Sequence, residues 1–257
     1  MAEDPDVVSR QTEDADVASR RADDPDVVSR RLARESLDRD DATGWFENLY
    51  AAAADGEAVV PWDRGTAHQL LVDWIDEAQP DGTGKTAVVV GAGTGWDAEL
   101  VADRGYDTTA FDISPSAIET ARRNHPGSRA HYLVADLLNP PADWHQAFDL
   151  VVEIYTVQAL PRPLQPTAIH QVTTLVAPGG TLLVIAAAAP DTTSPTAAPS
   201  THAEAQSDAV SDEAQGPPWP LSRATIQSFS TPDLHLIQLD RTPSPTILRW
   251  RAEYLRD

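Results

Sequence analysis

The chain has 257 residues, 41% of them hydrophobic, a length that suits one α/β domain with appended segments better than two full domains. It contains no cysteine, which excludes disulfides, thiolate-bound zinc and a cysteine nucleophile. The 40 acidic residues outnumber the 19 basic ones, and the net charge of −21 repels phosphate backbones, which argues against nucleic acid as a partner.

Residues 1–41 have the composition of a disordered acidic tail. Within them, residues 3–10, 13–20 and 23–30 repeat with a ten-residue period and end alike in Ser-Arg. Each copy offers only one pair of apolar side chains to bury, which is too little to offset the entropy of ordering the segment. We therefore expect a disordered tail, with a partner-docking tail as the alternative, and place the folded domain at residues 42–257.

The next part of the chain alternates between strand and helix patterns. Residues 86–90 form the apolar run of a buried strand, and further strands are expected at residues 107–111, 130–134, 148–153 and 181–185. Helical patterns lie between them at residues 96–104, from Ser114 onward, and at 164–176. Because helices separate the strands, we expect right-handed crossovers and a parallel sheet with helices on both faces.

The last part of the chain changes character. Residues 190–218 are rich in Ala, Ser, Thr, Pro and acids, which predicts a long flexible loop. The loop ends in residues 216–221, where stiff prolines and Trp219 are suited to an ordered wall. Residues 234–239 and 246–254 then alternate like strands. Their connection is too short for a helical crossover, so they are expected to pair antiparallel at the sheet edge.

A glycine-rich turn, Gly91-Ala92-Gly93-Thr94-Gly95, follows the first buried strand. Glycines let the backbone approach a ligand, and the next helix presents free N–H groups and its positive dipole end to a negative group. Two ligands compete for this turn. Gly93-x-Gly95-x-x-Ala98, with Asp112 downstream, satisfies the dinucleotide fingerprint, whose pyrophosphate faces the helix. In the other interpretation the helix faces the carboxylate of a methionine moiety.

Two aspartates end the second and third strands. Asp112 lies beside the glycine turn and can accept both hydroxyls of a ribose; alternatively it caps the next helix, but Ser114 already suits that role. Asp136 can accept from an adenine amino group, with Leu137 against the ring, or it is an ordinary turn aspartate. A dinucleotide enzyme has no evident need for an acid at this place.

Five motifs, taken in chain order, resemble those of class I S-adenosylmethionine-dependent methyltransferases. They are Val89–Gly95, Phe111–Ser114, Val134–Leu137, Phe148–Glu153 and Leu175–Leu183. The resemblance covers roughly residues 43–256. It implies S-adenosyl-L-methionine as the cofactor and an α/β, Rossmann-like fold: a seven-stranded, mostly parallel sheet with helices on both faces and an antiparallel last strand.

Within that superfamily the chain is most similar to the thiopurine and thiol methyltransferase branch. This similarity rests on Trp45, Pro61–Gly65, Asp97 and Ala159–Pro161. It implies that Trp45 and Trp62 close over the methionine end of the cofactor, although plain core packing is the alternative for both. The cofactor-binding residues that the resemblance implies are Trp45, Trp62, Gly91, Ala92, Gly93, Asp112, Ile113, Asp136, Leu137 and Glu153.

Methyl transfer from a sulfonium is an in-line displacement in which the protein mainly orients the reactants and excludes water. Glu153 and Tyr155, at the carboxyl end of the fourth strand, are expected to face the acceptor channel as catalytic residues. Alternatively, Glu153 contacts the cofactor or a turn amide, and Tyr155 packs at the rim.

The acceptor pocket is expected between residues 45–62, the segment after the fourth strand and the Pro217–Pro220 wall. This setting favours a small aromatic or thiol-bearing acceptor methylated at sulfur, with oxygen or nitrogen as alternatives.

Two other functions stay open: a cofactor-binding protein of this fold without methyl transfer, and a NAD(P)-dependent oxidoreductase. The Pro178-Gly179-Gly180 turn and Asp136 argue against the second. The seven histidines show no metal-ligand spacing, so no metal is expected. No apolar run reaches the roughly 20 residues of a membrane helix, and the acidic start lacks signal-peptide features. We therefore expect a cytoplasmic protein acting on small molecules, without nucleic-acid or membrane partners, and leave its oligomeric state open.

Overall fold

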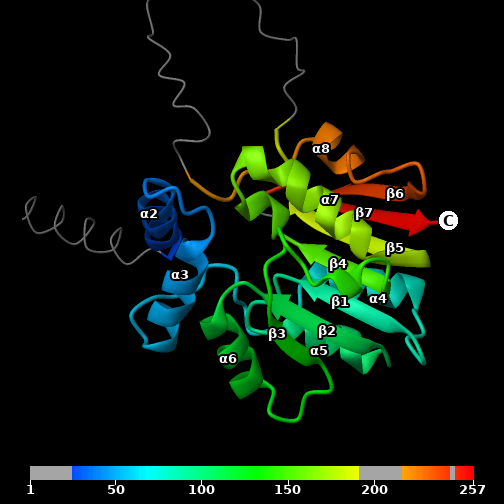
Figure 1. Ribbon diagram of the computed structural model, residues 1–257, viewed down its shortest axis with the longest axis horizontal. Coiled ribbons are helices and arrows are strands. Elements are labelled where there is room, and N and C mark those ends of the chain that lie inside the picture. The colour runs from blue at the N-terminus through cyan, green and yellow to red at the C-terminus, as the bar shows by residue number, and fades with distance from the viewer. Residues whose placement is uncertain (1–24, 191–215, 244–246) are drawn as a thin grey trace, which may run out of the picture.

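The computed structural model describes residues 25–190, 216–243 and 247–257. In these ranges the centre of the molecule is a seven-stranded sheet with the strand order β3-β2-β1-β4-β5-β7-β6 (Figure 1). The strands are β1 (Thr86–Val90), β2 (Asp107–Asp112), β3 (His131–Val134), β4 (Phe148–Ile154), β5 (Val176–Ala187), β6 (Leu234–Thr242) and β7 (Arg249–Arg256).

The pairing within the sheet confirms the predicted fold class. Strands β1 to β5 pair in parallel, whereas β7 pairs antiparallel with both β5 and β6. The short connection between β6 and β7 forces this antiparallel pair, as the sequence predicted. Because β7 runs against β5, its first residue, Arg249, lies opposite Ala187 at the end of β5. The start of β7 therefore lies at the edge of the sheet where the parallel strands end.

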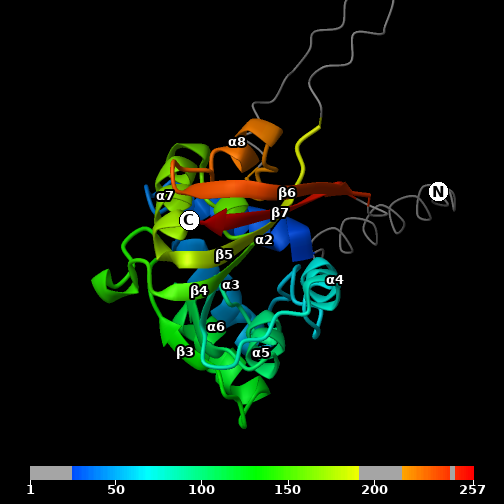
Figure 2. The same cartoon turned by 90° about the vertical axis from the view of Figure 1, so that its right-hand side faces the viewer.

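Helices cover both faces of the sheet, as predicted (Figure 2). Val88 and Val90 of β1 pack into a core with α7, whereas Ala87 and Val89 pack into a second core with α4 and α5. Strand alternation thus divides each central strand between two apolar layers. The α-helices are α2 (Pro25–Leu37), α3 (Gly44–Ala54), α4 (Gln69–Ala78), α5 (Trp96–Asp103), α6 (Pro115–Asn124), α7 (Gln165–Leu175) and α8 (Arg223–Gln227).

The end of the segment predicted to be disordered forms a helix instead. Helix α2 covers residues 25–37 and packs against α3, with Ala33 and Ser36 fully buried. The prediction of disorder was wrong for these residues because it considered only the valine pairs of the repeats. In the structure, small side chains make the buried contacts of α2. Residues 1–24 and 191–215 lie outside the described residues, so the disorder expected for the first 24 residues and for most of the flexible loop stays a prediction.

Helices α2 and α3 lie beyond the arrowheads of the parallel strands in Figure 1, at the edge where open α/β sheets bind ligands. This arrangement brings the start of the chain over the carboxyl ends of the strands. None of the helices in the described ranges has both the length and the apolar character that a bilayer span requires.

Candidate active site

A cavity of about 410 Å³ opens at the carboxyl ends of the parallel strands. Its wall combines the N-terminal helices, the glycine turn, the ends of β2 to β4, Pro217 and Pro218, and the start of β7. Most of the residues predicted to form the site line it together: Trp45, Trp62, Gly91, Ala92, Gly93, Asp112, Ile113, Asp136, Leu137 and Tyr155.

The glycine turn forms one side of this cavity. Gly91 and Gly93 have φ angles of 62° and 53°, in the left-handed region that favours glycine. A Cβ atom on Gly93 would lie 2.8 Å from the hydroxyl of Tyr50, and one on Gly91 would collide with Thr156. The turn therefore keeps its glycines both for backbone conformation and for lack of space.

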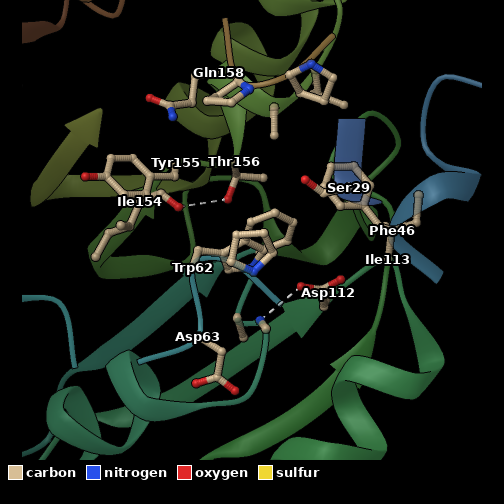
Figure 3. Close-up of a pocket in the computed structure, with 18 of the residues that line it drawn as sticks. Ser29, Phe46, Trp62, Asp63, Asp112, Ile113, Ile154, Tyr155, Thr156 and Gln158 are labelled. Atoms are coloured by element: carbon tan, nitrogen blue, oxygen red, sulfur yellow. Dashed lines mark hydrogen bonds between the residues drawn. The ribbon is translucent and has the colours of Figure 1, made fainter. Parts of the chain in front are cut away.

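Asp112 is held at the bottom of the cavity by backbone amides. Its Oδ2 accepts from Gly93 N at 3.0 Å and its Oδ1 from Ser114 N at 2.9 Å (Figure 3). Burial raises the pKa of this carboxyl, and the amide hydrogen bonds oppose the rise. Ser114 caps α6 through its own hydroxyl, which accepts from Ala117 N at 3.0 Å. The cap therefore belongs to Ser114, and Asp112 presents a fixed carboxylate to the cavity.

Asp136 and Leu137 line the cavity at the end of β3. Oδ1 of Asp136 accepts from Leu138 N at 2.8 Å, which is the turn role that the sequence analysis kept as an alternative. The side chain is half-buried, and Leu137 beside it is buried. A carboxylate oxygen and an apolar surface thus lie next to each other in the wall.

Trp45 and Trp62 meet at the cavity with different degrees of burial. Trp45, on α3, is 2% exposed and packs in a small core with Ala33 of α2 and Ala117 of α6, whereas Trp62 is 39% exposed. Their rings meet edge to face at 5.9 Å. The Trp62 indole nitrogen donates to the Tyr50 hydroxyl at 2.9 Å, beside Gly93. In the view of Figure 3, Trp62 lies between Asp112 and Tyr155. Trp62 therefore covers part of the cavity from the solvent side, whereas Trp45 both lines the cavity and packs in the core.

Tyr155 forms a polar cluster with two residues from distant segments, which we call the tyrosine cluster: His68, Tyr155 and Arg249. The hydroxyl of Tyr155 accepts from Arg249 Nε at 2.5 Å and lies 3.2 Å from His68 Nε2. Tyr155 has a φ angle of 63°, which turns its ring out of the strand direction at the end of β4. Tyr155 lines the cavity, as predicted.

The surroundings of His68 keep its imidazole neutral. Burial lowers the pKa of His68 to about 4, with help from the positive charges of Arg249 and Arg64. His68 Nδ1 accepts from Leu70 N at 3.2 Å and so caps α4. His68 N donates to Asp97 at 2.7 Å, and burial raises the pKa of Asp97 to about 6. The imidazole is thus neutral at pH 7.

Glu153 does not line the cavity, contrary to the prediction that it faces the acceptor channel. It shares its face of β4 with Val151 and is fully buried in the core under α7. Its Oε1 accepts from Thr156 N at 2.8 Å and Val157 N at 2.9 Å, and burial raises its pKa to about 7. The turn-amide contact named as an alternative is the observed one. Alternation along the strand turns the carboxyl away from the cavity.

The proline wall is only partly as expected. Pro217 and Pro218 line the cavity, but Trp219 is 2% exposed in the core, and its backbone N donates to Gln158 O at 2.8 Å. The sequence analysis missed Tyr50, His68 and Arg249. Arg249 could have been found from topology, because an antiparallel last strand begins at the ligand-binding edge. No local pattern singled out the other two.

Across the described ranges, no group of three or more His, Asp or Glu side chains could hold a metal ion. Nor does any cavity residue carry a thiol, since the chain has no cysteine. The side chains in the wall therefore offer carboxylates, hydroxyls, an amide, aromatic rings, one neutral imidazole and arginines.

Comparison with known proteins gives consistent results. A methyltransferase domain family matches residues 87–180. Thiocyanate methyltransferase 1 of Brassica oleracea is 26% identical over 132 residues, which are 50% of this chain and 57% of that protein. The ubiquinone biosynthesis O-methyltransferase of Stutzerimonas stutzeri is 29% identical over 128 residues, 46% of this chain and 54% of that protein. The alignments thus span little more than half the length of these relatives.

A solved structure agrees with the fold. It comes from work on the conversion of a disulfide bond into a thioacetal group during echinomycin biosynthesis, and it is 21% identical with a TM-score of 0.61. The likeness covers 82% of this chain and 93% of the other one. Because the two chains are only 21% identical, this likeness shows the fold alone. The methyltransferase domain matched at residues 87–180 and the two methyltransferase relatives support the resemblance to class I S-adenosylmethionine-dependent methyltransferases.

Proposed function

We propose that this chain is a cytoplasmic enzyme that transfers a methyl group from S-adenosyl-L-methionine to a small aromatic or thiol-bearing acceptor, with sulfur as the favoured methylated atom. One observation carries the proposal. The glycine turn, the carboxylates of Asp112 and Asp136, and Tyr155 converge on a single cavity at the ends of the parallel strands.

The wall near the glycine turn fits the proposed cofactor. Asp112 keeps acceptor capacity for ribose hydroxyls because each oxygen uses only one lone pair on a backbone amide. Asp136 and Leu137 offer an acceptor for an adenine amino group and an apolar surface for the ring, to which Ile113 adds. Gly91 and Gly93 line the cavity without a side chain, which lets the methionine end approach the backbone of the turn. Trp45 and Trp62 cover that end.

When bound, S-adenosylmethionine supplies an activated methyl group on a sulfonium. The protein then has to orient the acceptor and keep water out. Trp62 and Tyr50 close the cavity over the glycine turn, and the hydroxyl of Tyr155 is placed to hydrogen-bond the acceptor. Glu153 holds the turn that carries Tyr155, so we assign it a positioning role.

Sulfur is favoured as the methylated atom for two reasons. A thiolate is a soft nucleophile that needs no strong base. Burial raises the pKa of Tyr155, so the phenol stays protonated at neutral pH and can donate a hydrogen bond but cannot act as a base. In addition, one relative is named a thiocyanate methyltransferase. The other is named an O-methyltransferase, which keeps oxygen as the alternative.

Binding and turnover measurements test the proposal in two stages. Calorimetry should show binding of S-adenosylhomocysteine but not of NAD, together with a higher melting temperature, because a ligand selective for the folded state stabilises it. Labelled S-adenosylmethionine is then supplied with a panel of aromatic thiols, phenols and amines. Methylation of thiols above the others is the expected result.

Each other outcome points to a named alternative. Heat with NAD but none with S-adenosylhomocysteine would favour the oxidoreductase. Cofactor binding without turnover of any acceptor would favour a binding protein of the same fold. Turnover confined to phenols or amines would move the methylated atom to oxygen or nitrogen.

A further inference from the structure

Arg249 lines the cavity of a very acidic protein, yet it forms no ion pair with a carboxylate among the described residues. It is half-buried, and among the described residues its hydrogen-bond partner is Tyr155. Arg251 and Arg256, on the same strand, both form ion pairs with acids. With 40 acids and only 19 bases in the chain, a charge left unpaired inside a cavity indicates a partner from outside.

Arg64 lies in the same wall and also lacks an ion pair within the part of the chain that the structure describes. The positive charges of Arg64 and Arg249 both lower the pKa of His68 and help keep its imidazole neutral. Among the described residues, Asp63 and Asp97 form no ion pair with either arginine: Asp63 is exposed at the cavity, and Asp97 accepts from His68 N.

The hydrogen bonds of the tyrosine cluster leave one proton for a ligand. Because His68 Nδ1 accepts from Leu70 N, the neutral ring carries its hydrogen on Nε2 and donates it to Tyr155. The Tyr155 oxygen accepts from Arg249 as well. Both of its lone pairs are then used, so its own O–H points away from these two donors. A ligand atom at this place must accept a hydrogen bond.

We infer that the acceptor enters the cavity as an anion, an aromatic thiolate, whose negative sulfur is held by the guanidinium of Arg249 and the hydroxyl of Tyr155. The inference rests on the proposed function and makes its substrate class specific. A single localised charge also agrees with the strongly acidic surface, which disfavours polyanions.

This form of the acceptor removes the need for a general base. The thiolate sulfur supplies the electron pair of the new bond to the methyl carbon. The pair of the broken carbon–sulfur bond stays on the sulfur of the departing S-adenosylhomocysteine, and the product is a neutral thioether. No proton is transferred in this step. The product loses the charge that held the substrate, which weakens its hold on Arg249 and favours release.

Binding in the absence of a methyl donor tests the inference. 4-Nitrobenzenethiolate is coloured, so it is titrated by absorbance into the protein saturated with S-adenosylhomocysteine, and 4-nitrothioanisole, its neutral S-methyl counterpart, is titrated by calorimetry. The wild type should bind the thiolate at least tenfold more tightly than the thioether. Arg249→Gln should weaken thiolate binding about 10- to 100-fold, the scale of a hydrogen bond to a charged group, and should leave thioether binding unchanged.

Three further variants separate charge, geometry and folding. Arg249→Lys keeps the charge without the planar fork and should recover part of the loss. Tyr155→Phe should weaken thiolate binding less than Arg249→Gln does. Arg123→Gln removes one exposed positive charge at the end of α6, outside the cavity wall, and should have no effect. Unchanged affinity for S-adenosylhomocysteine in each variant shows that the fold is intact.

The outcomes distinguish this inference from the proposed function. Equal binding of thiolate and thioether, or thiolate binding that does not depend on Arg249, would overturn the anionic site even if the protein methylates thiols. Arg249-dependent thiolate binding without methyl transfer would uphold the anionic site and overturn the proposed function.

Discussion

The two sides of the cavity are built in different ways. The side near the cofactor motifs consists of the glycine turn, Asp112 and Asp136, which end three adjacent strands and lie within 46 positions of the chain. The tyrosine cluster joins His68, Tyr155 and Arg249, which are separated by 87 and 94 positions. The first side holds its carboxylates through backbone amides nearby in sequence. The second holds its groups through side chains from distant segments.

This difference suggests a division of roles. Strand-end motifs are rigid because each is part of the sheet and its first turn, which suits recognition of a ligand that stays the same. The tyrosine cluster depends on the loop before α4, the turn after β4 and the first residue of β7. We expect substitutions in these segments to change acceptor binding more than cofactor binding. The predictions below test whether the two sides are energetically separate.

The largest expected effect concerns Glu153, which supports the turn of Tyr155. Burial raises its pKa to about 7 from an ordinary value of 4.5. Its folded-state pKa lies above its unfolded value, so the stability it confers is present below pH 4.5 and is lost as pH rises through 7. The loss is on the order of 3 kcal/mol. Glu153→Gln cannot ionise and should therefore exceed the wild type in stability by that order at pH 8.

Chemical denaturation at pH 5 and pH 8 measures this effect. The gain from Glu153→Gln should shrink to about 1 kcal/mol at pH 5. Glu119→Gln, an exposed change of the same charge on α6, should give no such pH dependence. Methyl transfer by Glu153→Gln should stay within a few fold of the wild type. A loss of activity with an unchanged stability profile would return Glu153 to a catalytic role.

The next effect concerns the other side of the cavity. Asp112→Ala should weaken the binding of S-adenosylhomocysteine by about 1.5–3 kcal/mol, the scale of hydrogen bonds to a charged group. Once the protein is saturated with S-adenosylhomocysteine, thiolate binding should be close to that of the wild type. Calorimetry and the absorbance titration measure the two affinities, with the exposed Asp103→Ala as a matched control. An equal loss in both would show that the two sides are coupled.

The smallest expected effect concerns α2, whose Asp26, Ser29 and Arg30 line the cavity. A chain beginning at residue 41 lacks α2, and one beginning at residue 25 retains it. Because α2 buries only small side chains, its loss should cost about 1–2 kcal/mol, or a fall of about 2–8 °C in melting temperature. The KM for the acceptor should rise. Identical melting and kinetics of the two truncated chains would show that α2 contributes nothing.

Much of the fold and of the cofactor side could be predicted from the sequence. Strands β1 and β4 were found because central parallel strands are nearly continuous apolar runs, and the other parallel strands because they alternate with helical segments. The antiparallel edge followed from a connection too short for a crossover. Asp112 and Asp136 were found because a residue that ends a parallel strand must lie at the ligand-binding edge, wherever the rest of the chain goes.

The acceptor side was decided by the tertiary structure. Glu153 and Tyr155 are two residues apart at the end of β4, yet one is buried among apolar side chains and the other lines the cavity. Strand alternation would place both side chains on one face, but β4 ends at Ile154 and Tyr155 has a φ angle of 63°, so its side chain leaves that face. The burial of Trp219 and the place of Arg249 at the cavity could likewise not be read from the local apolar pattern. Their positions depend on how distant segments pack, and only the strand ends are set by the local course of the chain.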